Sequence, residues 1–142
     1  HRSKTLSQRD VQSAIRLFFV GELGKHAIGQ ATKTVTKYLN FVSEKNGVRV
    51  SIADKSGIIF PPSRVRYILE NKLADYKSDF RISSIVPIYL ASAIQYLIEE
   101  ILDLSGYQEP DFDKKTIQID DIKNAIKNDD ELSRTLCRLI GI

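Results

Sequence analysis

Hydrophobic residues recur at helical spacing through the first third of the chain. The apolar face of the first predicted helix consists of Val11, Ala14, Ile15 and Phe18. Ser7 and Asp10 fit a capping box at the start of this helix, and Gly21 ends it. A second helix is predicted from about Glu22 to about Tyr38, because small and apolar residues keep the same spacing there.

The helical pattern fails between residues 40 and 55, which we interpret as a linker. Turn signals occur at 46–47 (NG) and 56–57 (SG), and a weak alternation over 48–52 leaves a short hairpin strand as the alternative. A short helix is predicted from Pro61 and Pro62, because proline is tolerated in the first turn of a helix. A polar loop follows at 75–84.

Residues 84–106 form the longest predicted helix, which would be roughly 30 Å long at 1.5 Å per residue. It is apolar around much of its circumference, through Ile88, Leu90, Ala91, Ile94, Leu97, Ile98, Ile101, Leu102 and Leu104. A helix that is apolar on several sides has to be covered on several sides. Its two short neighbours are too small for this, so we expect a further partner. A last helix is predicted from about Asp129.

A thirteen-residue sequence occurs twice in the chain. Residues 4–16 (KTLSQRDVQSAIR) return as residues 115–127 (KTIQIDDIKNAIK), with five identical positions. Each copy predicts a basic loop, a short extended stretch and a helix that begins near an aspartate. Two copies indicate two related supersecondary units in one polypeptide.

Composition favours a folded protein with an uneven charge. The 142 residues are 42% hydrophobic, and the net charge is +3. Residues 1–56 carry ten Lys and Arg against four Asp and Glu, whereas residues 57–142 carry eleven against fourteen. This asymmetry is compatible with one surface for polyanions and another for cationic partners, or with ordinary solvated helix faces. The one cysteine, Cys137, excludes an intramolecular disulfide and is expected to be a structural thiol. No segment is long and apolar enough to span a membrane.

The sequence offers little for catalysis or metal binding. His1 and His26 stand apart from any Cys or carboxylate set with metal-ligand spacing. Residues 111–113 (DFD) begin like a calcium loop but lack the glycine and terminal glutamate of an EF-hand. The glycines at 21, 24 and 29 form no phosphate loop. We expect neither an enzyme nor a cofactor.

Three segments in the second part of the chain resemble 2A-type core histones. Residues 56–65 (SGIIFPPSRV) are similar to the start of their histone fold, 87–106 (PIYLASAIQYLIEEILDLSG) to the long helix, and 125–132 (AIKNDDEL) to the acidic turn that follows. The resemblance implies an all-α histone fold, in which short, long and short helices pair head to tail with a partner.

The first third resembles 2B-type histones instead, over 16–27 (RLFFVGELGKHA) and 31–38 (ATKTVTKY). We therefore expect the back half of a second histone fold at 1–39, a linker at 40–55 and a 2A-type histone fold with a C-terminal helix at 56–142. A 2B-type segment fused ahead of a 2A-type segment resembles the histone doublets of large DNA viruses (Marseillevirus-like). The front half of the 2B-type unit is then an expected partner.

The resemblance implies two sets of DNA-binding residues in paired loops. Head-to-tail pairing would bring a second loop beside a first loop at each end of the dimer. The expected phosphate contacts in these loops are Arg2, Lys4, Thr5, Arg81, Lys114, Lys115 and Thr116, and the resemblance implies that Arg64, early in the first short helix, also reaches the DNA backbone. Ile117 stands where 2A-type histones usually carry an arginine that enters the minor groove, so weaker anchoring is expected there.

The resemblance also implies an acidic patch on which nucleosome-binding factors dock an arginine. Its expected members are Glu22, Glu100, Asp103, Asp129, Asp130 and Glu131. Gln30 and Gln95 replace two usual acidic members, so the patch should be less negative. As carboxylates alone, these residues could simply favour the N-terminal ends of helices.

These expectations together predict a histone that helps to form a nucleosome-like particle and compacts double-stranded DNA without sequence specificity. The expected dimerisation core is Ile94, Leu97, Ile98, Ile101 and Leu102. Further expected partners are 3-type and 4-type core histones, which could also form a doublet. No interaction with a membrane is expected. The expected location is chromatin, in a nucleus or in a viral factory and virion. The alternative is a histone-fold subunit of a transcription or chromatin-remodelling complex, in which the fold serves mainly protein assembly.

Overall fold

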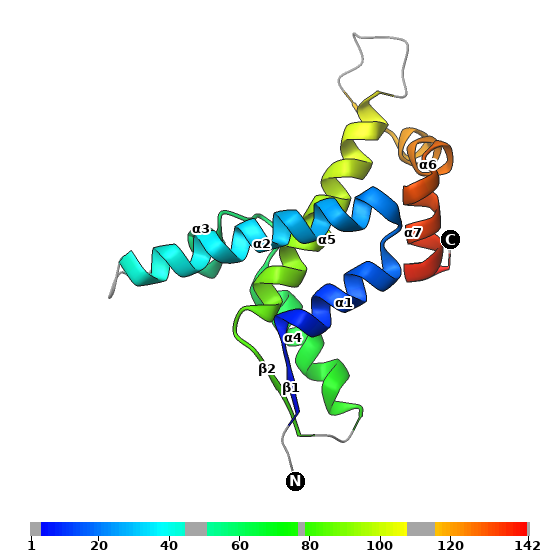
Figure 1. The fold of residues 1–142 in the computed structure, drawn as a ribbon. Coiled ribbons are helices and arrows are strands. Elements are labelled where there is room, and N and C mark those ends of the chain that lie inside the picture. The colour runs from blue at the N-terminus through cyan, green and yellow to red at the C-terminus, as the bar shows by residue number, and fades with distance from the viewer. Residues whose placement is uncertain (1–3, 45–50, 77–78, 108–115, 142) are drawn as a thin grey trace.

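The structure, a computed structural model, describes residues 4–44, 51–76, 79–107 and 116–141, and these are mostly helical (Figure 1). In chain order the elements are β1 (Lys4–Leu6), α1 (Gln8–Phe18), α2 (Gly21–Glu44), α3 (Ile52–Ser56), α4 (Pro62–Ala74), β2 (Phe80–Ile82), α5 (Val86–Gly106), α6 (Ile119–Asn128) and α7 (Asp130–Ile140). No helix in these ranges is long and apolar enough to cross a membrane.

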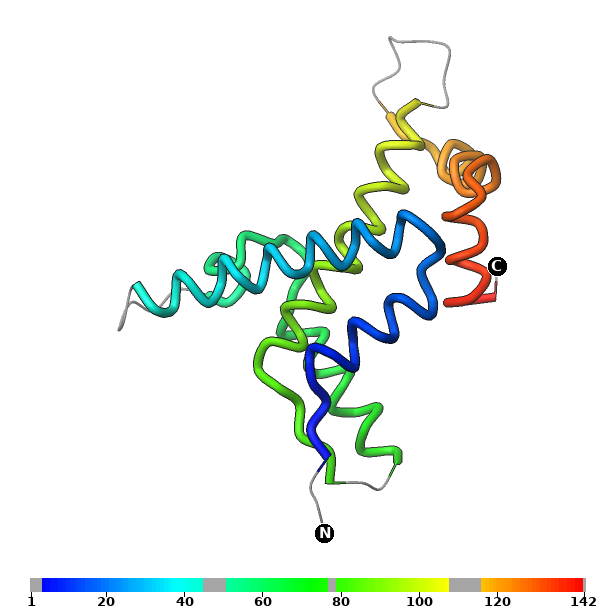
Figure 2. The backbone as a smooth tube through the Cα atoms, in the orientation of Figure 1, coloured from blue at the N-terminus to red at the C-terminus, as the bar shows by residue number. Residues whose placement is uncertain are grey.

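The long helix α5 lies at the centre of the fold, with the short helices α4 and α6 before and after it in the chain (Figure 2). This short–long–short order is the one that the histone resemblance predicts. The helices α1 and α2 form a V that packs against α5. The sequence predicts that the long helix begins near residue 84, whereas the observed helix begins at Val86 with Pro87 in its first turn.

The predicted capping box at the start of α1 is present. The backbone N–H of Ser7 donates to Oδ2 of Asp10 at 2.8 Å, and the N–H of Asp10 donates to Oγ of Ser7 at 3.4 Å. The hydrogen bond from the Ser7 backbone holds the pKa of Asp10 below its ordinary value. Local polar spacing alone therefore specifies where this helix begins.

Both ends of the expected linker are helical, which differs from the sequence interpretation. Helix α2 continues to Glu44, beyond the end predicted near Tyr38, and α3 occupies Ile52–Ser56. Ser51 caps α3 by accepting a hydrogen bond from the N–H of Asp54 at 3.1 Å, and Gly57 ends it with a φ of 74°. The packing of α3 against α2 stabilises both segments, and this tertiary contact has no signal in the local pattern.

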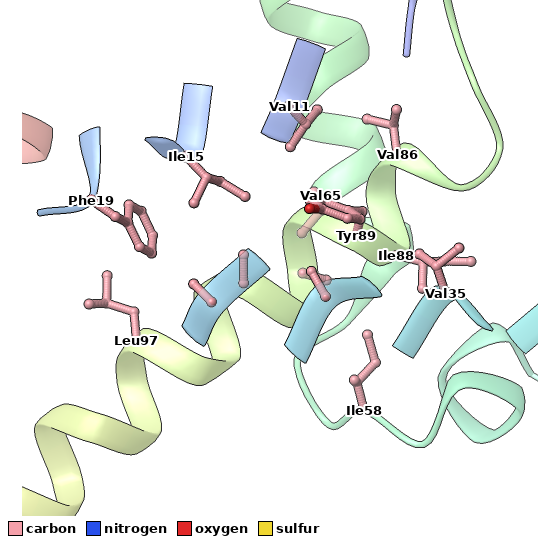
Figure 3. Close-up of a cluster of buried hydrophobic side chains, with 14 of the residues drawn as sticks. Val11, Ile15, Phe19, Val35, Ile58, Val65, Val86, Ile88, Tyr89 and Leu97 are labelled. Carbon is pink, nitrogen blue, oxygen red and sulfur yellow. The ribbon is translucent and has the colours of Figure 1, made fainter. Parts of the chain in front are cut away.

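Small side chains allow α2 and α5 to cross closely at the centre of the core. Ala27 and Ala31 on α2, and Ala91 and Ala93 on α5, are fully buried. The hydroxyls of Thr34 and Ser92 form a buried hydrogen bond of 2.7 Å between the two helices. Around this crossing lie larger apolar residues that Figure 3 labels, namely Val11, Ile15, Phe19, Val35, Ile58, Val65, Val86, Ile88, Tyr89 and Leu97.

The expected dimerisation residues of α5 lie in different environments. Leu97 is buried, and Ile94 and Ile101 are half-buried. Ile98 and Leu102 remain 38% and 44% exposed, although α1, α2, α4 and α6 all contact α5. Cys137, expected to be a structural thiol, is an exposed free cysteine because it lies on the outer face of α7.

Candidate nucleic-acid interface and acidic surface

Two basic segments that are distant in sequence lie side by side in the β1–β2 pair. The strands are parallel, and Thr5 is aligned with Arg81 and Lys4 with Phe80. Nζ of Lys4 lies 5.9 Å from the centre of the Phe80 ring, within the range of a cation–π contact. The segment before α1 therefore pairs with the segment before α5, as head-to-tail pairing of histone folds predicts.

Three exposed cations, two in the β1–β2 pair and one at the start of α4, are available to bind an anion. Lys4, Arg64 and Arg81 are exposed, and no carboxylate in the described part of the chain forms a salt bridge with any of them. Arg66, by contrast, forms a salt bridge of 2.8 Å with Glu70. Arg64 lies in the first turn of α4, which has no side-chain cap, so its free N–H groups also favour a phosphate.

Residues 116–118, the described part of the second expected DNA-binding loop, lie at the other end of α5 (Figure 1). Thr116 and Ile117 are exposed there and precede α6. The N–H of Gln118 donates to Oδ2 of Asp121 at 2.8 Å, which fixes the start of that helix. Arg2, Lys114 and Lys115, which belong to the same predicted set, lie outside the described residues.

Several of the expected acidic residues lie around the ring of Tyr96. The pKa of Tyr96 is raised to about 12, chiefly by burial and then by the charges of Glu100 and Glu131. The ring of His26 packs edge-on against the ring of Tyr96, with 6.3 Å between the two ring centres. Nε2 of His26 lies 3.9 Å from Oε2 of Glu22. Helices α2, α5 and α7 thus each contribute a carboxylate to one neighbourhood.

Five of the six acidic residues interact with other groups of the chain, Glu100 through a hydrogen bond with Tyr96. Glu22 forms a salt bridge of 3.0 Å with Lys25, whose hydrogen bond lowers the pKa of Glu22. Asp130 lies 3.5 Å from Arg134. Asp129 and Glu131 accept backbone N–H groups instead. For Glu100 and Asp103 the described part of the chain provides no basic partner within salt-bridge distance.

Gln95, one of the two amides at the acidic surface, holds a loop in place. Its Oε1 accepts hydrogen bonds from the N–H groups of Ile59 and Phe60 at 2.7 and 2.9 Å. Its Nε2 donates to Glu99 at 2.9 Å. Gln95 and Gln30 both line a polar cavity of about 180 Å³ between α2 and α5. Gln95 therefore attaches the segment before α4 to the long helix.

The sequence analysis missed the roles of Thr135 and Arg138 on α7. Their side chains contact the corner between α1 and α2, through backbone atoms of Val20 and Leu17. A usable signal was present, because Glu131, Thr135 and Arg138 are polar at positions i, i+4 and i+7 of one helix. What they contact, more than a hundred residues earlier, has no local signal.

The raised pKa of Tyr96 predicts a loss of stability in alkali. An unfolded tyrosine ionises near pH 10, whereas folded Tyr96 keeps its proton until about pH 12. Across this window the unfolded chain binds fewer protons than the folded one, so the free energy of unfolding falls. Urea unfolding of Tyr96→Phe should show a shallower fall than the parent chain over that window. Exposed Tyr67→Phe is the control, and identical profiles for the parent and Tyr96→Phe would contradict the prediction.

No family model matches the chain, but several curated proteins are similar to it. It is 36% identical over 141 residues to a 2B-type histone of Dictyostelium discoideum, covering 91% of this chain and 61% of that protein. It is 32% identical over 127 residues to a histone doublet of Melbournevirus, whose name gives a 2B-type histone joined to a 2A-type histone; the match covers 89% of this chain and 45% of that protein. It is 40% identical over 90 residues to a 2A-type histone of Lodderomyces elongisporus, covering 63% of this chain and 67% of that protein.

The chain thus spans 61% and 45% of the first two relatives. These likenesses agree with the short–long–short order of α4, α5 and α6 and with the pairing of β1 and β2. The predicted all-α histone fold is confirmed, and the chain belongs to the histone family.

Proposed function

We propose that this chain is a structural, non-catalytic component of a nucleosome-like particle that wraps and compacts DNA without sequence specificity. The observation that carries the proposal is the β1–β2 pair, which holds Lys4, Thr5 and Arg81 together on an exposed surface. Histones of the 2B and 2A types are among the relatives of the chain, which supports a chromatin role. The place of action would be chromatin, in a nucleus or in a viral factory and virion.

The basic residues would act by neutralising phosphates. Lysine and arginine contacts to phosphates position a duplex without reading its bases, so preference would come from how easily the DNA bends. One contact region would be the β1–β2 pair, and another the loop before α6, which includes Lys114, Lys115 and Thr116. Arg64, in the first turn of α4, would make a separate contact. The β1–β2 pair and Thr116 lie at opposite ends of α5, a separation of roughly 30 Å for a helix of this length. Ile117 would weaken anchoring at the second region.

We further propose the doublet arrangement, with the back half of a 2B-type unit at 1–39 and a 2A-type unit at 56–142, joined through residues 40–55, both ends of which are helical. The likeness to a viral doublet that covers 89% of this chain supports it. Leu17 and Phe18 on α1, and Ile98 and Leu102 on α5, are exposed apolar residues that the long helix of the 2B-type unit would cover. The remaining partners would be 3-type and 4-type core histones.

The acidic surface would dock a cationic partner of the particle. Glu22, Glu100 and Glu131 lie near one another around Tyr96 and His26, which supports a single negative surface. The amides Gln30 and Gln95 reduce its charge, so such a partner would bind mainly through one or a few basic residues.

Salt dependence of DNA binding tests the role of the basic pair. For Lys4→Ala combined with Arg81→Ala, the slope of log K against log salt should fall by about 1.8, since each phosphate contact contributes about 0.9. Arg66→Ala is the control, because Glu70 already neutralises that guanidinium. Equal slopes for the parent and the double variant would contradict the assignment.

Nuclease protection tests the particle itself. The chain would be reconstituted with partner histones and DNA and then digested with micrococcal nuclease. A protected fragment of defined length is expected. Protein assembly without any protected DNA would contradict the nucleosomal role and favour a subunit of a transcription or remodelling complex.

A further inference from the structure

A small polar cavity lies between α2, α5 and the segment that follows α3. The lining residues that matter for its chemistry are Gln30, Lys33, Lys37, Ile58, Gln95 and Glu99. The volume of the cavity is about 180 Å³. A single buried water needs about 10–15 Å³ of such space, so the cavity has room for a group of the size of a phosphate.

Two cations on one face of α2 line this cavity. Lys33 and Lys37 are four residues apart, so their side chains are neighbours on the helix surface. Neither forms a salt bridge within the described part of the chain, whereas Lys25 on the same helix is paired with Glu22 at 3.0 Å. Two like charges at this spacing repel each other, and an anion between them would offset the repulsion.

The end of α3 leaves space for the ammonium group of Lys37. Gly57 ends α3 with a φ of 74°, and Nζ of Lys37 lies 2.5 Å from the position that a Cβ at Gly57 would occupy. A side chain at position 57 would therefore displace this ammonium group. Among the described residues no oxygen accepts a hydrogen bond from Nζ, although the group lies at the wall of a polar cavity.

A backbone donor at the cavity also lacks a partner. Ile58 is buried and lines the cavity, and its N–H donates to no acceptor in residues 4–44, 51–76, 79–107 and 116–141. The next two N–H groups, of Ile59 and Phe60, donate to Oε1 of Gln95 instead. Buried N–H groups are rarely unpaired in native proteins, so this one favours an acceptor bound in the cavity.

The hydroxyl groups around the cavity are already in use as donors. The Thr34 hydroxyl donates to the carbonyl oxygen of Gln30 at 3.0 Å, which leaves the Ser92 hydroxyl as the donor in their 2.7 Å contact. The Ser56 hydroxyl donates to the carbonyl oxygen of Ile52 at 2.7 Å. The donors that remain for a ligand are the two ammonium groups, the unpaired backbone N–H and the side-chain amide of Gln30. This set of donors suits an anion.

We propose that this cavity binds a compact oxyanion of the phosphate class, which Lys33 and Lys37 hold through charge-assisted hydrogen bonds. The side-chain amide of Gln30 and the N–H of Ile58 complete the set of donors. Glu99 is the one carboxylate among the described lining residues, so with two lysines the wall carries a net charge of +1. The site is separate from the β1–β2 pair and does not depend on the proposed DNA contacts. A free phosphate ion and the phosphate group of a phosphorylated side chain share this chemistry.

A titration with inorganic phosphate tests the site. The intact protein would be labelled isotopically, and the backbone amide signals of Gln30 and Ile58 would be followed by NMR at constant ionic strength. We expect saturable shifts at these amides. The double variant Lys33→Gln with Lys37→Gln should bind phosphate at least roughly tenfold more weakly. Both lysines are exposed and glutamine has a similar helix propensity, so the fold should be kept.

Lys25→Gln is the matched control, because it removes a positive charge from the same helix outside the cavity. Its affinity for phosphate should change by less than about twofold, since exposed charges at a distance are screened. Glu99→Gln tests the opposite sign and should tighten binding by roughly threefold, because it removes a repelling charge from the wall. Unchanged binding in the double variant, no tightening in Glu99→Gln, or no saturable shift in the parent chain would overturn the proposal.

A phosphoserine peptide and its unphosphorylated form, titrated in the same way, identify the source of the oxyanion. Tighter binding of the phosphoserine peptide than of inorganic phosphate, with no binding of the unphosphorylated form, would assign the site to a modified side chain of a partner. Tighter binding of inorganic phosphate would assign it to the free ion. Equal binding of the two peptide forms, with no shift at Ile58, would overturn the phosphate site.

Discussion

Replacing Leu132 by alanine is expected to lower the free energy of unfolding by about 2–5 kcal/mol, the usual range for a fully buried leucine. Leu132 is 1% exposed, and it attaches α7 to the core directly beside Glu131. The cavity left by the substitution would loosen α7 and with it the contacts that Glu131, Thr135 and Arg138 make with the corner between α1 and α2. Urea unfolding followed by circular dichroism measures the effect.

The matched control is Leu139→Ala, the same change on the same helix. Leu139 is 40% exposed, so we expect a loss of about 1 kcal/mol or less. A similar loss in both variants would show that α7 is not packed as described.

Replacing Ala31 by leucine is expected to separate α2 from α5. Ala31 is fully buried at the crossing of these helices, where the small side chains leave no room for an isobutyl group. Overpacking of a dense core typically costs about 1–3 kcal/mol, and a contact between two helix backbones lies at the upper end of that range. The same unfolding measurement applies, with hydrogen exchange along α2 as a second readout.

Gly29→Ala, two residues earlier on α2, provides a control of opposite sign. A Cβ at Gly29 would meet no atom within 4 Å, and glycine inside a helix is less favourable than alanine by about 0.5–1 kcal/mol. We therefore expect a small gain in stability. Destabilisation by both substitutions would contradict the close crossing of α2 and α5.

Elements with a local signal were predictable from the sequence. The capping box of Ser7 and Asp10 marks the start of α1, and the apolar residues between Ile88 and Leu104 identify the long helix. The histone resemblance then supplied the order of the helices and the pairing of the segments before α1 and α5. Local chemistry and a long specific resemblance were sufficient for these features.

Features that depend on tertiary contacts could not be predicted in this way. The continuation of α2 to Glu44 depends on packing with α3, which lay within the expected linker. The sequence predicts Glu131 as a member of a solvent-facing acidic patch. In the structure its two carboxylate oxygens accept hydrogen bonds from the N–H groups of Glu22 and Leu23. A carboxylate has the same sequence signature in both roles, and only the position of the opposing backbone distinguishes them.

The contact of α7 with the corner between α1 and α2, through Glu131, Thr135 and Arg138, also has a consequence for the order of events during synthesis. Arg138 and the carbonyl of Leu17 are 121 residues apart, so the corner between α1 and α2 leaves the ribosome well before the helix that holds it. At about 5–20 residues per second this delay is roughly 6–24 s. During that interval the nascent chain presents an uncapped corner and an uncovered core surface to chaperones and to other histones. Synthesis of α7 is thus required before this corner can be held.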